Sequence, residues 1–130
     1  MEIEEVVYHP IGIVHSEFDS QEKTPKSYEE SGETEAEILI NPAYLVAMSG
    51  IEAGKKYMVI FHFHKSLPFR QIVSMRGDGP LTPLFSTHSP NRPNPIGVSI
   101  ITVTEVLGNI IKFKGVDMMD GTPILDIKSA

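Results

Sequence analysis

Hydrophobic and polar positions alternate in short runs along this chain, which is the period of a β-strand rather than of a helix. The runs predict strands at residues 6–15, 34–40, 57–64, 71–75, 84–87, 96–106, 110–116 and 124–127. One short helix is predicted over residues 43–48, because Asn41 offers an N-cap and Pro42 suits the first helical position. The pattern therefore predicts an all-β fold, an antiparallel barrel or sandwich with one short helix and long irregular loops.

The connections between these strands have their own signals. Residues 17–33 are polar without a hydrophobic period and predict a long loop, and residues 67–95 hold six of the ten prolines, which predicts rigid irregular loops. Gly108-Asn109 and Asp120-Gly121 are expected to be tight turns. No strand leads through a glycine-rich turn into a helix, which excludes dinucleotide-binding and P-loop folds.

Composition narrows the class of protein. A chain of 130 residues is expected to form a single domain, residues 1–130. It has no cysteine, no long apolar run and an acidic start, so we expect a cytoplasmic protein without a membrane segment. The net charge of −6 is uneven, because residues 1–37 hold 11 acidic residues against two lysines, whereas residues 38–130 carry a net charge of +3. This distribution permits a polyanionic partner without arguing for one.

Residues 85–99 (FSTHSPNRPNPIGVS) are the first candidate for chemistry. Prolines at positions 90, 93 and 95 stiffen the backbone, so the polar side chains between them would be held at fixed positions for a ligand. We expect the side chain of Arg92 in particular to serve a ligand rather than the fold. The competing interpretation is a proline-rich turn between strands.

Carboxylates and histidines form the other candidates. Residues 116–128 contain three aspartates, at positions 117, 120 and 126, whose spacing is not that of an EF-hand but suits ribose hydroxyls or an ammonium group. His62 and His64 would share one face of a strand and could, with His88, hold a metal ion, although a buried or edge role is the commoner one for histidine. Several basic residues could contact phosphates.

RPNPIG at residues 92–97, followed by DGTPILDIK at residues 120–128, resembles the TsaA-like family, the tRNA methyltransferase O family. YHPIGIVHSEF near the start and GIEAGKKYMVIFHFHKS at residues 50–66 resemble it too, so the resemblance covers nearly the whole chain. It implies a compact β-barrel, a homodimer, S-adenosylmethionine as cofactor, and methylation of N6 of threonylcarbamoyladenosine beside the tRNA anticodon.

The resemblance also implies site residues. Those expected to bind the cofactor are Thr87, His88, Ser89, Arg92, Pro93, Asn94, Ile96, Gly97, Ser99, Asp120, Gly121, Thr122, Pro123 and Asp126. Candidate contacts to the tRNA are Lys55, Lys65, Arg70, Arg76 and Lys128. Two side chains, His88 and Asp126, are candidate proton acceptors by chemical type, although no strong base is required.

The expected assembly follows from size as well as from the resemblance. A barrel of 130 residues offers little concave surface for both a cofactor and an RNA arm, so we expect a homodimer with its interface near residues 85–99 and each cofactor close to both subunits. Two other functions stay open at this point. One is a metal-dependent barrel enzyme built on His62, His64 and His88, and the other is a non-catalytic barrel that binds a nucleotide-like ligand.

Overall fold

The computed structural model describes residues 1–16, 35–74, 79–115 and 117–130. Its strands are β1 (Gly12–His15), β2 (Glu35–Ile40), β3 (Lys56–His62), β4 (Ile72–Ser74), β5 (Leu81–Pro83), β6 (Ile96–Leu107), β7 (Ile110–Lys114) and β8 (Pro123–Ser129). Helical structure in these residues is limited to two 3-10 turns, η1 (Pro42–Tyr44) and η3 (Leu84–Ser86). None of the described helices is long and apolar enough to cross a membrane. The prediction of an all-β, antiparallel fold is confirmed.

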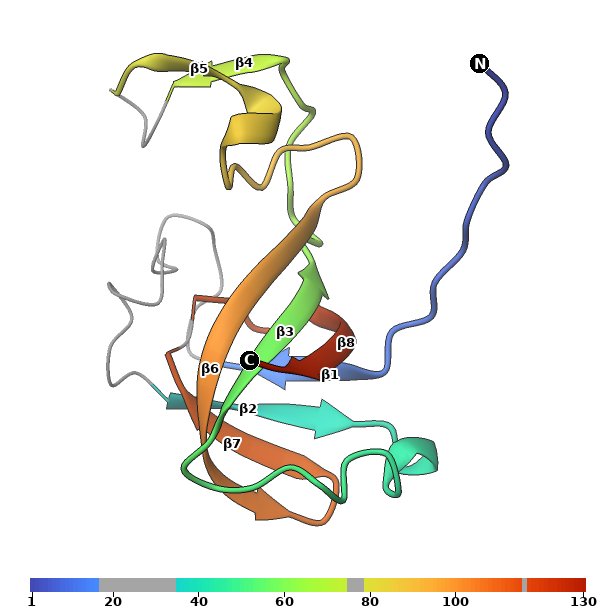
Figure 1. Ribbon diagram of the computed structural model, residues 1–130, viewed down its shortest axis with the longest axis vertical. Helices are drawn as coiled ribbons and strands as arrows, with labels where there is room; N and C mark the ends of the chain where they lie inside the picture. The colour runs from blue at the N-terminus through green and yellow to red at the C-terminus, as the bar shows by residue number, and fades with distance from the viewer. Residues whose placement is uncertain (17–34, 75–78, 116) are drawn as a thin grey trace.

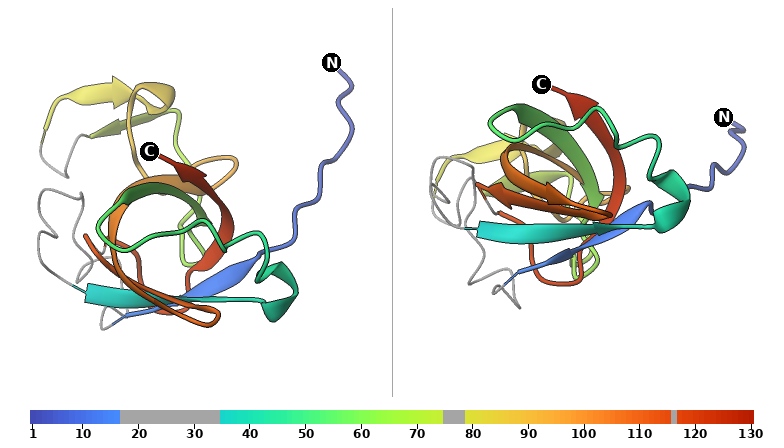
Figure 2. Two further views of the ribbon diagram at one scale, coloured as in Figure 1. Left: turned by 60° about the horizontal axis from the view of Figure 1, so that its bottom comes forward. Right: turned by 90° about the horizontal axis from the view of Figure 1, so that it is seen from below.

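Six of the strands pair in a ring. Their order is β1-β2-β7-β6-β3-β8, every pairing is antiparallel, and β8 pairs in turn with β1 (Figures 1 and 2). The twelve-residue β6 reaches both β3 and β7, with a register shift between Val103 and Glu105 that allows it to bend. A second register shift lies opposite β3, where Leu125 of β8 is skipped between Ile124 and Asp126.

The hydrophobic core fills the inside of this ring. Alternate residues of each strand point inward, as the period of two requires, and Phe113, Ile38 and Val59 have no exposed surface. The remaining core side chains on the strands are Val14, Ala36, Ile40, Phe61, Ile101, Val103, Ile111 and Ile124. Burying one such large side chain stabilises a fold by about 1.5–3 kcal/mol, so this core is the main support for the segments that carry the candidate site.

Residues 67–95, which we call the hairpin segment, leave the ring beyond the end of β3 and return into β6 (Figure 1). Within the described residues, β4 and β5 pair only with each other. Leu84 is buried, and its amide donates to the carbonyl of Gln71 at 2.8 Å. The base of the segment is tied by Phe63, whose amide donates to the carbonyl of Pro95 at 2.7 Å.

The first strand is shorter than predicted. It begins at Gly12 rather than at residue 6, and residues 1–10 are exposed. The physical reason lies at Pro10, which has no amide hydrogen and so cannot extend the pairing that starts at Ile11, whose amide donates to the carbonyl of Ile124.

The helix predicted over residues 43–48 is also reduced. Asn41 does cap it, since its side-chain oxygen accepts from the amide of Ala43 at 3.0 Å, but only the 3-10 turn η1 forms and turns follow as far as Gly50. A segment of six residues is too short to propagate a helix against the entropic cost of nucleation.

The third difference concerns residues 84–87, predicted as a strand. They form η3 instead, closed by the Thr87 hydroxyl, which donates to the carbonyl of Leu84 at 2.7 Å, and the strand of this region is β5 just before it. β3 ends at His62, so His64 lies beyond the strand and the argument that placed both histidines on one strand face was wrong. The other strands lie within about two residues of their predicted limits, and residues 17–33 and Arg76 fall outside the described residues.

Candidate functional site

The Arg92 guanidinium is bound by its own loop. Its Nη1 donates to the carbonyl oxygens of Thr87 at 2.9 Å, Ser89 at 3.2 Å and Leu84 at 3.5 Å. The guanidinium also lies 5.9 Å from the centre of the Phe85 ring. We expected this side chain to serve a ligand; in the structure, Nη1 closes the loop by donating hydrogen bonds to its backbone carbonyls. Among the described residues, Nε and Nη2 have no hydrogen-bond partner and remain available to a ligand.

Other polar side chains of the same loop are also used internally. The Thr87 hydroxyl accepts from the amide of Ser89 at 3.2 Å, and the Ser89 hydroxyl accepts from the amide of Asn91 at 3.4 Å. Asn91 in turn accepts from the amide of Leu67 at 2.6 Å and so fixes the loop to the other end of the hairpin segment. These bonds make the loop a preformed rigid element, on which His88, Pro93 and Asn94 are exposed.

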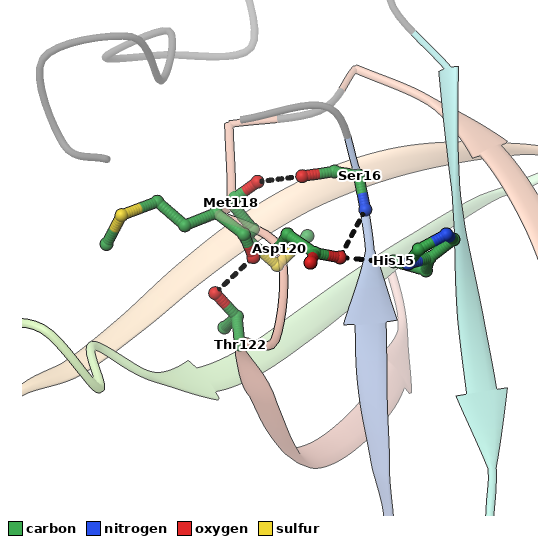
Figure 3. A network of polar contacts seen from close by, with 6 residues as sticks. His15, Ser16, Met118, Asp120 and Thr122 are labelled. Carbon is green, nitrogen blue, oxygen red and sulfur yellow. Dashed lines mark hydrogen bonds and ion pairs between the residues drawn. The ribbon is translucent and has the colours of Figure 1, made fainter. Parts of the chain in front are cut away.

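The second motif is held against β1. Asp120 Oδ1 accepts from the amide of Ser16 at 3.0 Å and lies 2.9 Å from Nδ1 of His15 (Figure 3). The Ser16 hydroxyl donates to the carbonyl of Met118 at 3.1 Å, and the buried Thr122 hydroxyl donates to that of Met119 at 2.7 Å. Gly121 has a φ of +82°, which favours glycine, so the turn predicted at Asp120-Gly121 is confirmed. The carboxylate of Asp120 therefore acts as the anchor of this turn.

The two motifs lie on opposite sides of β3, because β3 pairs with β6 at the end of the first motif and with β8 in the second. Phe61 of β3 lies opposite Gly97 on β6 and opposite Ile124 on β8, while Val59 lies opposite Ser99 and Ile127. A β-carbon on Gly97 would lie 2.4 Å from Cζ of Phe61 and 2.7 Å from Cζ of Phe63, so only glycine fits beneath the two rings. The rings pack edge to face with centroids 4.9 Å apart. The glycine of the first motif is thus required by packing.

Three buried polar atoms near both motifs have no hydrogen-bond partner among the described residues. They are Ser99 Oγ, Asp117 Oδ1 and His64 Nδ1. Ser99 is 3% exposed and lies on the inner side of β6, close enough to Asp117 for its hydroxyl to lower the pKa of that carboxyl. Burial has the larger, opposite effect and raises the pKa of Asp117 to about 6.

His64 lies against the second motif. Its Nε2 is 3.6 Å from where a β-carbon of Gly121 would be. Burial lowers the pKa of His64, the positive charges of Lys65 and His62 lower it further, and the backbone and charge of Asp120 oppose these effects. A mostly neutral imidazole, a carboxylate and a hydroxyl are therefore available to a ligand that can donate hydrogen bonds.

Two open cavities lie on the ring, both away from the first motif. One of about 360 Å³ is lined by residues that include Tyr44, Met48, Tyr57, Asp126 and Lys128. The other, of about 420 Å³, is lined by residues that include His15, Ser16, Glu37 and Lys112. None of the described residues 87–99 lines either cavity, so neither of these two cavities joins Asp126 to the first motif.

Asp126 and the basic candidates within the described residues are exposed. Asp126 forms an ion pair with Lys128 at 3.2 Å, and Lys55 forms one with Glu52 at 3.1 Å, which raises the pKa of Lys55. Lys55 precedes β3 and Lys65 follows it, so the two are separated by a strand that spans about 23 Å. Arg70 is exposed on the hairpin segment, and Arg76 lies outside the described residues. The basic candidates therefore do not form one compact patch.

The described residues do not support a metal-dependent enzyme built on His62, His64 and His88. In the part of the chain that the structure describes, no group of three or more His, Asp or Glu side chains could hold a metal ion. The sequence suggested His64 only as a metal ligand and Asp117 only as one of three aspartates. The signals that the sequence does not display are the closeness of His64 to the turn at Gly121 and that of Asp117 to Ser99.

Comparisons with known proteins give one consistent result. The sequence model of a family described as tRNA-methyltransferase O N-terminal domain matches residues 13–129. A probable S-adenosyl-L-methionine-binding protein of Methanothermobacter thermautotrophicus is 36% identical over 126 residues, covering 95% of this chain and 89% of that protein. A similar protein of Pyrococcus abyssi is 34% identical over 123 residues, covering 95% of this chain and 67% of its own length.

Longer proteins match as well. A tRNA (adenine(37)-N6)-methyltransferase of Mus musculus is 34% identical over 137 residues, covering 98% of this chain but 31% of the mouse protein. The crystal structure of TrmO from Pseudomonas aeruginosa superposes with a TM-score of 0.80 at 27% identity, covering 99% of this chain and 57% of that one. The chain thus spans just over half of the solved structure and about a third of the mouse enzyme.

Proposed function

The chain belongs to the tRNA-methyltransferase O family, and from that premise we propose that it is an S-adenosylmethionine-dependent methyltransferase acting on N6 of adenosine in tRNA. We propose threonylcarbamoyladenosine beside the anticodon as the modified nucleoside. The observation that carries the proposal is the match over residues 13–129, which includes both motifs, together with their positions on either side of β3. The names of the mouse and archaeal relatives support the reaction and the cofactor. A tRNA substrate is consistent with a cytoplasmic protein.

The residues beside the two motifs fit this cofactor. S-adenosylmethionine carries an ammonium group, ribose hydroxyls and an adenine amino group, all of which donate hydrogen bonds. The unpartnered atoms Ser99 Oγ, Asp117 Oδ1 and His64 Nδ1 are able to accept them. We propose that these three side chains, the free nitrogens of Arg92 and the exposed Asn94 hold the cofactor.

The chain's own residues would act chiefly by orientation. When bound, the cofactor supplies a methyl group that its sulfonium charge already activates. The loop fixed by Arg92 and the turn fixed by Asp120 are preformed, so little conformational entropy is lost when they align the reactants. Either His88 or Asp126 is the proposed acceptor of the N6 proton, and both are exposed to solvent into which the proton can pass. Lys55, Lys65, Arg70, Arg76 and Lys128 are proposed to contact the tRNA.

We also propose that the closed ring is a compact β-barrel and that two copies form a homodimer near residues 85–99. The closure of the ring between β1 and β8 supports the first statement. Exposed apolar side chains support the second, since Phe85 is 81%, Val98 49% and Ile96 38% exposed. Light scattering at micromolar concentration measures the mass, and a monomer with full activity would contradict a shared site.

Nucleoside mass spectrometry tests the proposed reaction. The protein is incubated with S-adenosylmethionine and tRNA, and a mass increase of one methyl group on threonylcarbamoyladenosine is expected. S-adenosylhomocysteine should also raise the melting temperature, because a ligand at about 100 times its Kd stabilises the native state by about 2.7 kcal/mol. Stabilisation without methyl transfer would identify a non-catalytic binding protein. The absence of both stabilisation and methyl transfer would refute the cofactor assignment.

A carboxylate variant locates the cofactor. Asp117→Asn should weaken S-adenosylhomocysteine binding in calorimetry by at least tenfold, because a charge-assisted hydrogen bond contributes about 1.5–3 kcal/mol. Glu105→Gln is the matched control, since Glu105 is an exposed carboxylate that pairs with Lys112 on the β6–β7 hairpin. Equal affinities for the two variants would show that Asp117 does not contact the cofactor.

A further inference from the structure

Residues 1–10, which we call the N-terminal arm, are exposed and make no hydrogen bond with the rest of the described chain. Both figures of the whole chain show the arm running away from the ring, with no other segment beside it (Figures 1 and 2). Its large apolar side chains are nevertheless numerous: Ile3 is 77%, Val6 68%, Val7 67% and Tyr8 70% exposed.

The sequence of the arm suits a binding segment better than a solvated tail. Val6, Val7 and Tyr8 are β-branched or aromatic residues that favour extended structure packed on a surface. The closed ring offers the arm no free edge, and Pro10 prevents it from continuing β1. Four large apolar side chains exposed within six residues exceed the scattered exposure that is usual for a soluble surface.

The hairpin segment also carries exposed apolar side chains. We call this set the hairpin face, and its members are Leu67, Phe69, Ile72, Leu81 and Phe85, which are 64%, 47%, 57%, 77% and 81% exposed. Ile72 and Leu81 lie on the same face of the β4–β5 pair, because Ile72 is opposite Pro83 and Leu81 is opposite Ser74. β4 and β5 form a separate two-stranded sheet that no other described strand joins. Isolated two-stranded sheets are at best marginally stable in water, so this segment gains from an additional packing partner.

We propose that the N-terminal arm of one copy packs on the hairpin face of a second copy, reciprocally about a two-fold axis. The charges are complementary, since the arm carries Glu2, Glu4 and Glu5 and the exposed cation of Arg70 follows Phe69 of the hairpin face in the chain. An extended arm of ten residues reaches about 33 Å, the scale of a small domain. The inference rests on the homodimer of the proposed function and adds to it a specific interaction. An RNA occupant is disfavoured for the arm, because its three carboxylates repel phosphates.

Cysteine crosslinking tests the contact, because the chain has no cysteine of its own. Val7→Cys and Phe69→Cys are prepared as separate proteins, with a mass tag on one, and are mixed under mild oxidation without cofactor or RNA. Val46→Cys mixed with Phe69→Cys is the matched control, since Val46 is also a valine and is 87% exposed. We expect the position 7–69 disulfide between copies to form at least tenfold faster than the position 46–69 disulfide.

Several results would overturn the proposal. Equal crosslinking rates would show that the arm has no preferred site on the second copy. A disulfide within one chain, formed in a Val7→Cys/Phe69→Cys double variant at high dilution, would show that the arm folds back on its own hairpin segment. Slow crosslinking in both mixtures, with tRNA protecting the new thiol at position 69 from alkylation, would assign the hairpin face to RNA.

Dimer affinity provides the second measurement. Val7→Glu should raise the Kd of the dimer by at least tenfold, or about 1.4 kcal/mol, while Val46→Glu should leave it unchanged. An unchanged Kd for Val7→Glu refutes the arm contact. Both measurements use the protein alone, so a failure here leaves S-adenosylhomocysteine binding and tRNA methylation as independent tests of the proposed function.

Discussion

Replacing Gly97 with alanine should destabilise the fold, because the added methyl group has no space. Its β-carbon would lie 2.4 and 2.7 Å from two ring atoms of Phe61 and 2.7 Å from one of Phe63. Contacts between carbon atoms are optimal at about 3.5–4.0 Å, so each ring would have to move by about 1 Å. Phe61 is 3% exposed and belongs to the core, where neighbouring side chains restrict such a movement.

The expected loss is about 1–3 kcal/mol of unfolding free energy, the usual cost of overpacking a core. This is a substantial part of the 5–15 kcal/mol by which domains are stable. Gly50→Ala is the matched control, because a β-carbon there would meet nothing within 4 Å. We expect that variant to be neutral or slightly more stable, by up to about 1 kcal/mol, since alanine restricts the unfolded chain.

Urea denaturation at equilibrium measures both variants, and a double variant tests the cause. In a Phe61→Leu background the ring tip is absent, so Gly97→Ala should cost at least about 0.5 kcal/mol less than in the native sequence. An unchanged midpoint for Gly97→Ala would refute the packing argument. Loss of S-adenosylhomocysteine binding at unchanged stability would show instead that the glycine serves close approach of the ligand.

Three further predictions concern polar residues in or beside the two motifs. Burial raises the pKa of Asp117 from 3.8 in the unfolded chain to about 6 in the folded protein. Between these pH values the native state binds more protons than the unfolded state, so the contribution of Asp117 to stability falls as pH rises from about 4 to 6. Asp117→Asn should therefore be more stable than the native protein at pH 7, by up to about 3 kcal/mol, and the difference should vanish near pH 4 in urea titrations; a pH-independent difference would contradict the assignment. Arg92→Ala should lower the free energy of unfolding by about 1–3 kcal/mol and hence the urea midpoint, because its hydrogen bonds to backbone carbonyls are lost. Arg70→Ala, at an exposed position, should leave the midpoint unchanged. Equal midpoints for the two variants would show that the Arg92 hydrogen bonds do not stabilise the fold. Asp120→Ala should cost about 1 kcal/mol and speed hydrogen exchange at the Ser16 amide, and unchanged exchange there would refute its role as the anchor of the turn.

The sequence predicted the elements whose signals are local. Alternation located β2, β3, β6, β7 and β8 to within about two residues, and glycine turns were found at residues 108 and 121. It failed where the outcome depends on which groups meet in the folded chain. Residues 6–10 have the composition of a strand but pair with no described strand, and Leu84–Ser86 became a 3-10 turn because the Thr87 hydroxyl and the Arg92 guanidinium bind the carbonyl of Leu84.

The side chains of the candidate site fall into two groups, those that hold the fold together and those that are left for a ligand. Thr87, Ser89, Arg92, Asp120 and Thr122 look like ligand-binding residues in the sequence, yet the side chain of each makes a hydrogen bond with the backbone of the fold, that of Asp120 with the amide of Ser16 and the others within their own loops. Changes at these positions should therefore weaken binding and stability together. Ser99 Oγ and Asp117 Oδ1 are buried and form no hydrogen bond of good geometry with a described residue, although the Ser99 hydroxyl lies close enough to lower the pKa of the Asp117 carboxyl; this incomplete pairing costs free energy. A substitution there that weakens ligand binding while leaving or improving stability would identify these two side chains as the ones that the fold reserves for the ligand.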